Sequence, residues 1–253
     1  MMRRLLERPM PAEIGGYVLE LPDAFHKVFA TSGGYHVEID TGADLSYDAT
    51  GLGRLVRKDF PAELGLSMPL CGTPRYTVVP VDGYHAAIGP VWKSADGKWH
   101  SLAEHSNAVA TVNAVHTDKD DLRFTVCWQG TMAGCTAVEQ QYRLSSEGLM
   151  VTCSVQRETP GEVGFVVPLI VSNGACVHGL LQEERGFVVS GQGACYAVRC
   201  IAPKEISLSL FRDSPDSRRV HRGANRNGVY HLGLFASSVC DQPFRLMFMF
   251  ERI

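Results

Sequence analysis

The sequence lacks the short patterns that commonly identify an enzyme. It contains no GxSxG nucleophile elbow, no HExxH zinc-binding helix, and no Gly-rich loop that follows a strand and opens a helix. α/β-Hydrolase chemistry, zincin proteolysis and nucleotide hydrolysis on a phosphate-binding loop therefore lose their usual support. None of the eight cysteines forms a CxxC pair, which removes the commonest redox and zinc motifs as well.

Long apolar runs are also missing. The N-terminal stretch MMRRLLERPMPAE has the positive charge of a signal peptide but no apolar stretch to follow it, and no other run reaches membrane-spanning length. Cys127 and Cys153 lie within strand-like apolar runs, where a free cysteine behaves as a small hydrophobic residue. We therefore expect reduced thiols, a cytoplasmic location and no membrane partner. The chain could also be a fragment of a longer protein.

An excess of charge of either sign is absent too. The formal net charge is -3, and charged residues make up 20% of the chain against 45% hydrophobic ones, which predicts a globule with a full core. No broad basic face is apparent, so we expect no nucleic-acid partner. The arginines between Arg212 and Arg226 form a local cluster that suits either an anionic ligand or a solvated loop.

Short strand-like runs are what the sequence has in quantity. From residue 76 onward, β-branched and aromatic runs alternate with turns rich in Gly, Asp, Asn or Ser. Two packed sheets are expected, because so many strands would be unwieldy in one open sheet. The sequence predicts an all-β fold, a large antiparallel β-sandwich in which residues 1–253 form a single domain and 1–15 a flexible or fragment-derived leader. The runs cover residues 76–81, 85–92, 108–116, 122–128, 137–144, 149–155, 164–171, 186–189, 194–201, 206–211, 230–235 and 244–250.

The first seventy residues have a different pattern. Strand-like stretches at 17–21, 27–31 and 35–40 lead into a long polar segment, TGADLSYDATGLGRLVRKDFPAE. Long loops inside a compact domain are commonly functional, so chemistry is expected in this part of the chain.

Polar side chains alternate along the predicted strand 35–40. His36, Glu38 and Asp40 would share one face, while the residues between them pack inward. An imidazole and two carboxylates on one face could hold a divalent metal, or could serve acid–base chemistry. The alternative is an ordinary solvated strand face.

The segment YDATGLGR, residues 47–54, combines a phenol, a carboxylate, two glycines and a guanidinium group. An ordered loop could present Tyr47 and Arg54 to a sugar, with Asp48 beside them. It could equally be a structural loop that crosses the end of the sandwich. Elsewhere His85 and His178 are candidate acid–base or substrate-contacting residues, although most histidines at such positions are ordinary hydrogen-bonded side chains.

The run YHVEIDTGADLSYDATGLGRLVRKDFPAELGLSMPLCGTPRYTV, residues 35–78, resembles the opening of the C-terminal β-domain of heparinase II/III-like proteins. YDATGLGR, followed by a proline-containing strand leader, carries the resemblance. It implies a supersandwich similar to that of galactose mutarotases, normally preceded by an α/α toroid, which this chain does not contain. It also implies an acidic polysaccharide or oligosaccharide as the partner.

In such lyases a base removes the proton beside a uronate carboxylate, and a cation or amide neutralises the developing enolate. By resemblance, His36 would be a catalytic or metal-contacting residue, and Tyr47 and Arg54 would contact the substrate. With the residue patterns added, we expect His36 and Tyr47 as catalytic residues and Arg54, Asp48 and His85 as substrate contacts. The resemblance also implies a possible metal at the residues described above, His36, Glu38 and Asp40.

Three functions follow as hypotheses. The first is the β-domain of a heparinase-like polysaccharide lyase, which binds acidic polysaccharide or helps to cleave it by β-elimination but is incomplete without a toroid. The second is a non-catalytic carbohydrate-binding or structural module. The third is a mutarotase-like sugar epimerase, in which His85 or His178 would act with Glu183.

Overall fold

The computed structural model describes residues 16–23, 25–44, 48–67, 88–118, 120–172, 176–211, 229–238 and 242–253. These ranges contain eighteen strands, two short 3-10 turns and no α-helix, which confirms the all-β prediction. None of them includes a helix that is long and apolar enough to cross a membrane. The strands are β1 (Tyr17–Leu21), β2 (Lys27–Ser32), β3 (Tyr35–Asp40), β4 (Gly51–Arg57), β5 (Leu66–Ser67), β6 (Gly89–Lys93), β7 (Trp99–Ser101), β8 (Val109–Asp118), β9 (Asp121–Met132), β10 (Cys135–Ser145), β11 (Gly148–Arg157), β12 (Val163–Ser172), β13 (Gly179–Glu183), β14 (Gly186–Gly191), β15 (Ala194–Ala202), β16 (Ser207–Phe211), β17 (Val229–Ser237) and β18 (Phe244–Arg252).

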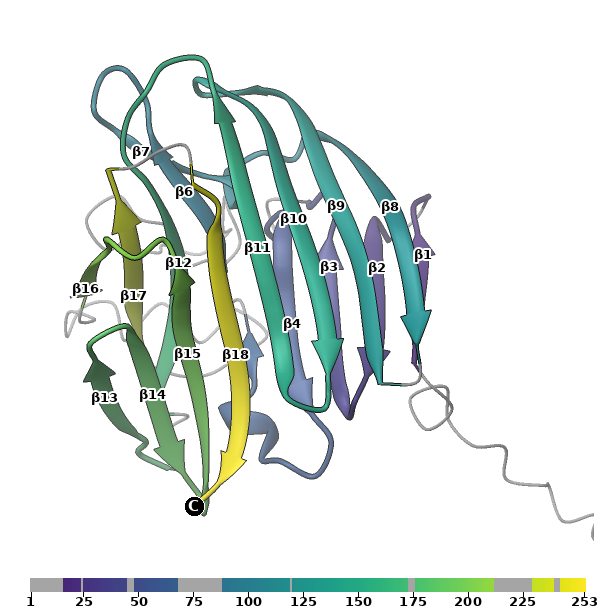
Figure 1. Ribbon diagram of the computed structural model, residues 1–253, viewed down its shortest axis with the longest axis vertical. Coiled ribbons are helices and arrows are strands. Elements are labelled where there is room, and N and C mark those ends of the chain that lie inside the picture. Colours follow the sequence, from purple (N-terminus) through teal and green to yellow (C-terminus); the bar gives the residue numbers. More distant parts are fainter. Residues whose placement is uncertain are drawn as a thin grey trace, which may run out of the picture.

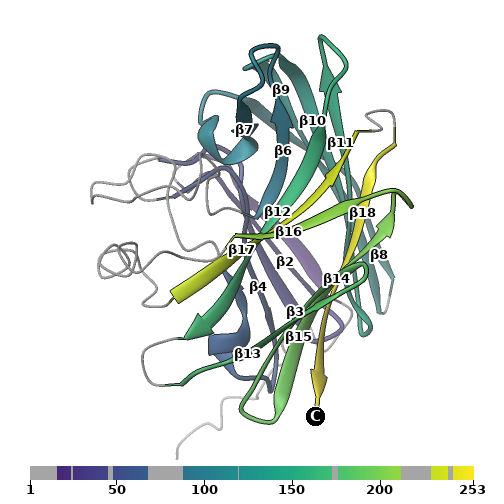
Figure 2. The ribbon, with the colours of Figure 1, turned by 90° about the vertical axis from the view of Figure 1, so that its left-hand side faces the viewer.

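The strands form three antiparallel sheets, which lie in two layers (Figures 1 and 2). One layer is an eight-stranded sheet with the order β13-β14-β15-β18-β11-β10-β9-β8. The other layer consists of two five-stranded sheets, β1-β2-β3-β4-β5 and β16-β17-β12-β6-β7. The molecule is therefore the large antiparallel sandwich that the sequence predicts.

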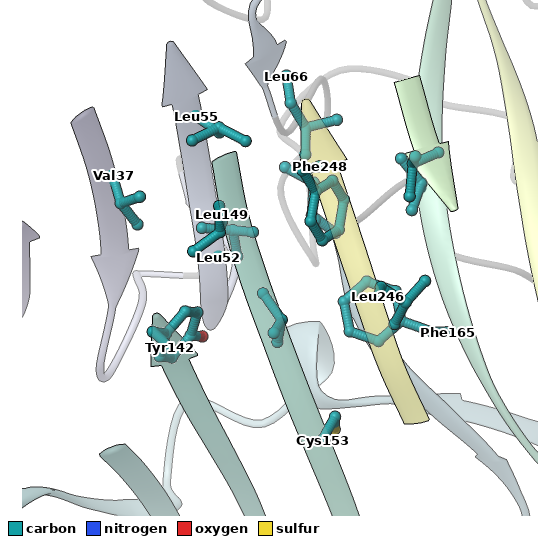
Figure 3. Close-up of a cluster of buried hydrophobic side chains, with 14 of the residues drawn as sticks. Val37, Leu52, Leu55, Leu66, Tyr142, Leu149, Cys153, Phe165, Leu246 and Phe248 are labelled. Atoms are coloured by element: carbon teal, nitrogen blue, oxygen red, sulfur yellow. The ribbon is translucent and has the colours of Figure 1, made fainter. Parts of the chain in front are cut away.

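A continuous hydrophobic core fills the space between the layers. Figure 3 shows Leu52 and Leu55 of β4 facing Leu149 of β11 and Phe248 of β18, with Phe165 of β12 beside them. These five side chains are fully buried. All three sheets contribute to the same core, because each one turns alternate residues toward the other layer.

The polar segment that follows residue 40 is partly a strand, and its prediction as one long loop is wrong. β4 begins at Gly51 and pairs with β3, and in that pairing Glu38 lies opposite Arg54 while Ile39 lies opposite Leu52. Gly53 is the extra residue of a β-bulge, so Leu52 and Leu55 both face the core although they are three positions apart. The bulge breaks the alternation by which a strand is normally identified.

The two layers are also joined at the far end of β18. The backbone N–H of Phe250 donates a hydrogen bond to the hydroxyl of Tyr35 over 3.2 Å, and Arg57 donates to the carbonyl of Phe250. The guanidinium group of Arg57 lies 4.7 Å from the ring centroid of Phe60. The first five-stranded sheet is therefore tied to the centre of the eight-stranded sheet by side-chain to backbone hydrogen bonds.

Candidate functional site

The outer face of β2, β3 and β4 carries most of the residues that the sequence predicts for a site. Strand register places Lys27 opposite Asp40, Phe29 opposite Glu38, and Thr31 opposite His36. On the other side of β3, Glu38 lies opposite Arg54. Because directly opposed residues share a face of a sheet, these side chains form one surface. We call it the β3 polar face, and it consists of Lys27, Phe29, Thr31, His36, Glu38, Asp40 and Arg54, with Asp48 at its margin.

Lys27 lies at the centre of the acidic part of this face. Its Nζ atom is 2.6 Å from Asp40 Oδ2, 3.2 Å from Glu38 Oε1 and 3.6 Å from Asp48 Oδ2. Asp40 is almost fully buried, with only 2% of its surface exposed. Burial by itself would lower the pKa of Lys27, but the hydrogen bond to Asp40 and the surrounding carboxylates raise it above its usual value. Lys27 is therefore a permanently charged counter-ion for this cluster.

The position of Lys27 bears on the metal site suggested by the sequence. His36, Glu38 and Asp40 do lie on one face as expected, but an ammonium group stands between the two carboxylates. Within the part of the chain that the structure describes, no group of three or more His, Cys, Asp or Glu side chains is arranged to hold a metal ion. Lys27 thus occupies the position between the carboxylates that a metal ion would take. The metal site of His36, Glu38 and Asp40 stays a prediction without structural support.

His36 is held in one orientation and is partly buried. Its Nδ1 atom lies 3.0 Å from the Thr31 hydroxyl, and its ring stacks on Phe29 with 6.0 Å between the ring centroids. Burial lowers the pKa of His36 below its usual value of 6.5, the nearby Arg54 lowers it further, and Glu38 opposes both effects. At neutral pH His36 is therefore mainly a neutral imidazole, the form that can accept a proton.

Arg54 and Asp48 are the accessible charged groups of the β3 polar face. Their side chains are 42% and 48% exposed, respectively. Arg54 Nε is shielded from solvent and lies 3.8 Å from Glu38 Oε2, so a ligand carboxylate would contact the exposed remainder of the guanidinium group. The structure thus brings together His36, Arg54 and Asp48 from the predicted set. Tyr47, His85 and the arginine cluster between Arg212 and Arg226 lie outside the described residues.

Three members of the face, Lys27, Phe29 and Thr31, were not predicted as site residues from the sequence. Lys27 and Phe29 alternate with core residues of β2, as a half-buried strand requires, but this pattern alone does not show which strand lies beside β2. Only the register with β3 places Lys27 among the carboxylates and Phe29 against His36. The face therefore combines an aromatic pair with charged hydrogen-bonding groups, an arrangement suited to a sugar ring and its substituents.

His178 and Glu183, which the epimerase hypothesis pairs, lie away from the β3 polar face, on and beside β13. His178 is 4% exposed. Glu183 of β13 forms a two-pronged ion pair with Arg199 of β15, with distances of 2.8 and 3.2 Å, and this contact lowers the pKa of Glu183. A buried imidazole and an ion-paired carboxylate of lowered pKa are a poor acid–base pair for a sugar.

Comparison with known proteins identifies the fold. No protein-family model and no curated protein matches the sequence. Among solved structures, heparan sulfate lyase HepC from Pedobacter heparinus superposes on 96% of this chain with a TM-score of 0.59 and 11% sequence identity, and a 4-alpha-glucanotransferase from Thermococcus litoralis on 94% with 0.51 and 14%. A galactose mutarotase-like protein from Clostridium acetobutylicum superposes on 95% with a TM-score of 0.53 and 10% identity.

The share of each known structure that is matched differs among these three. The match covers 36% of the lyase and 41% of the glucanotransferase, but 99% of the mutarotase-like protein. The chain thus spans about a third of the length of the lyase. At these identities the likeness concerns the fold alone: the chain has the galactose mutarotase-like supersandwich that also forms part of heparan sulfate lyases.

Proposed function

We propose that this chain is a heparinase-like β-domain that binds acidic polysaccharide through the β3 polar face and needs a second domain for cleavage. The observation that carries this proposal is the superposition of almost the whole chain on only 36% of a heparan sulfate lyase. In this proposal the remaining groups of the cleft come from a separate domain or chain, such as an α/α toroid.

The chemistry of the β3 polar face supports the choice of an acidic sugar. Arg54 is the exposed cation of the face, and its loose contact with Glu38 leaves N–H groups for a uronate carboxylate. Lys27 is less suited to this role, because its side chain is only 17% exposed and is surrounded by carboxylates. Phe29 and His36 would contact the face of the sugar ring.

β-Elimination requires a base and a group that neutralises the sugar carboxylate. His36 could accept the proton as a neutral imidazole, and Arg54 could oppose the carboxylate. In the proposal Tyr47 belongs to the same site, because it directly precedes Asp48 at the margin of the face. His85 remains a proposed substrate contact on its sequence alone.

Binding and turnover by the purified chain test this proposal. Uronate-containing and neutral polysaccharides would be compared by calorimetry, and elimination followed through the absorbance of unsaturated uronate. We expect binding of the uronate polymers without product, and weaker binding by Arg54→Met. Arg143→Met is a matched control, because Arg143 is 46% exposed and ion-paired but lies on the eight-stranded sheet. EDTA should leave binding unchanged, since the ammonium group of Lys27 neutralises Glu38 and Asp40 without a metal ion.

Each arm of this experiment can contradict the proposal. Rapid elimination by the chain alone would disprove its incompleteness. Equal weakening by Arg54→Met and Arg143→Met would remove the β3 polar face as the binding site. Loss of binding with EDTA would support the predicted metal site at His36, Glu38 and Asp40. Absence of binding to any glycan would favour a structural module.

A sugar epimerase is the second candidate, because the same fold makes up 99% of the mutarotase-like protein. A sandwich of this kind is thus a whole protein in that case. The surroundings of His178 and Glu183 argue against this candidate, so we expect the chain to leave the anomerisation rates of glucose and galactose unchanged. Polarimetry of freshly dissolved sugars would measure this, and acceleration would revive the epimerase hypothesis.

A further inference from the structure

Adjacent strands β11 and β18 are offset along their length, so each has a stretch that does not pair with the other. Their pairing extends only from Leu149 opposite Phe248 to Cys153 opposite Phe244. Beyond Phe248, the backbone of β18 at Phe250 is hydrogen-bonded by the side chains of Tyr35 and Arg57. Beyond Cys153, residues 154–157 of β11 pair with β10 on one side, and among the described strands none pairs with them on the other.

A pocket of about 430 Å³ lies at this second, open stretch. Its volume is within the range of roughly 300–1,000 Å³ that is usual for small-molecule sites. β11, the turn after it, and the start of β12 and β18 form its walls, so it shares no residue with the β3 polar face. The lining residues are Cys153, Ser154, Val155, Gln156, Arg157, Thr159, Pro160, Val163, Gln242, Pro243 and Phe244.

Two features of the walls keep the pocket open. Pro243 directly precedes β18 and has no backbone N–H, so it cannot extend the ladder along β11. On the opposite wall Arg157 donates to the carbonyl of Glu162 over 3.3 Å and to the carbonyl of Lys93. Gly161 permits this arrangement, because a Cβ atom there would lie 2.6 Å from Arg157 Nη1.

The lining has the composition expected for an uncharged polar ligand. Among the described residues, it includes hydroxyl and amide side chains from Ser154, Gln156, Thr159 and Gln242, and no carboxylate. Arg157 is the one charged side chain of the lining in the part of the chain that the structure describes, and its terminal nitrogens already bond to carbonyl groups of the protein. In an extended strand, alternate residues direct their backbone N–H and C=O toward the same side, so the free edge of β11 adds donors and acceptors.

We propose that this pocket is a second binding site, which takes one uncharged sugar unit of hexose size along the free edge of β11. The hydroxyls of the sugar would replace the missing strand as hydrogen-bonding partners, and the side chains of Gln156 and Gln242 would contact them. The class of ligand rests on the proposed carbohydrate function, whereas the location rests on the strand offset and the pocket alone.

Amide chemical shifts of the 15N-labelled chain would test the proposal during titration with methyl glucoside, methyl N-acetylglucosaminide and sodium glucuronate. We expect a neutral glycoside to give saturable shifts at residues 154–157 and at Gln242. Thr159→Trp, which fills the pocket, should abolish them, and Gln156→Leu should weaken binding about tenfold. Thr117→Trp, on the exposed edge strand β8, is the matched control and should bind normally.

Several outcomes would overturn the proposal. Shifts with glucuronate alone would show an anion site centred on Arg157, and no saturable shift with any sugar would remove the pocket as a site. Binding that survives in Thr159→Trp would place the ligand elsewhere. Arg54→Met distinguishes the two sites, because it should weaken polysaccharide binding and leave these shifts intact. Failure of one site therefore does not imply failure of the other.

Discussion

At the scale of single residues, two buried tyrosines differ in whether their hydroxyl has a partner. Tyr35 and Tyr196 both contact the ring of Phe250, with centroid distances of 6.0 and 5.2 Å. The Tyr35 hydroxyl accepts the N–H of Phe250, whereas the Tyr196 hydroxyl has no hydrogen-bonding partner within the described ranges. The same chemical change at each position should therefore have unequal effects.

Tyr35→Phe should lower the free energy of unfolding by about 1–3 kcal/mol, because it leaves the buried N–H of Phe250 without an acceptor. Tyr196→Phe should leave that free energy unchanged or raise it, since it removes a buried hydroxyl that has no hydrogen-bonding partner among the described residues. Urea unfolding of both variants measures the difference. Equal losses in the two variants would mean that the Tyr35 hydroxyl contributes no net stability.

The titration of His36 reports on the charges of the β3 polar face. Its folded pKa lies below the usual 6.5, so the stability it contributes is present above that pH and is lost as the pH falls through the lower folded value. Arg54→Met should raise the pKa of His36 and Glu38→Gln should lower it, because each removes one of the opposing charges. Proton NMR of the imidazole measures both shifts, and movement in the opposite direction would refute this arrangement of charges.

At the scale of strands, close contact between the layers depends on small residues. Gly233 of β17 faces Phe187 of β14, and a Cβ atom at this glycine would lie 2.7 Å from the phenylalanine ring. Gly53 of β4 has more space, because a Cβ atom there would lie 3.5 Å from the carbonyl oxygen of Glu38.

Gly233→Ala should therefore lower the free energy of unfolding by about 1–3 kcal/mol through overpacking of the core. Gly53→Ala should change it by no more than about 0.5 kcal/mol, since the added methyl group makes an ordinary contact. Thermal or urea unfolding would compare them. A neutral Gly233→Ala would show that β14 and β17 can move apart at little cost.

The strands also show which parts of the fold were accessible from the sequence. Alternation along β3 correctly predicted an inward Tyr35 and an outward His36, because period-two patterning is a local property. β4 was missed because the bulge at Gly53 interrupts that period. The counter-ion role of Lys27 was missed for a different reason. It depends on how β2 pairs with β3, and the sequence of either strand alone does not determine that register.

At the scale of the whole molecule, the two layers share one core. Buried residues from all three sheets belong to the same cluster, including Trp92 of the third sheet and Trp128 of the eight-stranded sheet. A single core is the basis of cooperative unfolding, so the prediction that the chain is one domain can be tested directly.

Unfolding in urea should give one transition, with coincident midpoints by tryptophan fluorescence and by far-ultraviolet circular dichroism. The two buried tryptophans report on different sheets, and replacing Trp99 together with one of them isolates the signal of the other. A fluorescence transition of Trp92 that precedes that of Trp128 would show that the third sheet unfolds as an independent unit.

The place of β18 has a consequence for synthesis on the ribosome. This strand follows every other strand of the eight-stranded sheet in the sequence, yet it lies between β15 and β11 and bonds to both (Figure 1). While translation proceeds, β8 to β11 can already form hairpins, but β13 to β15 have no link to them within the sheet. The nascent chain thus carries two half-sheets with exposed inner edges until Phe244–Arg252 emerges, the interval in which a chaperone would be most useful.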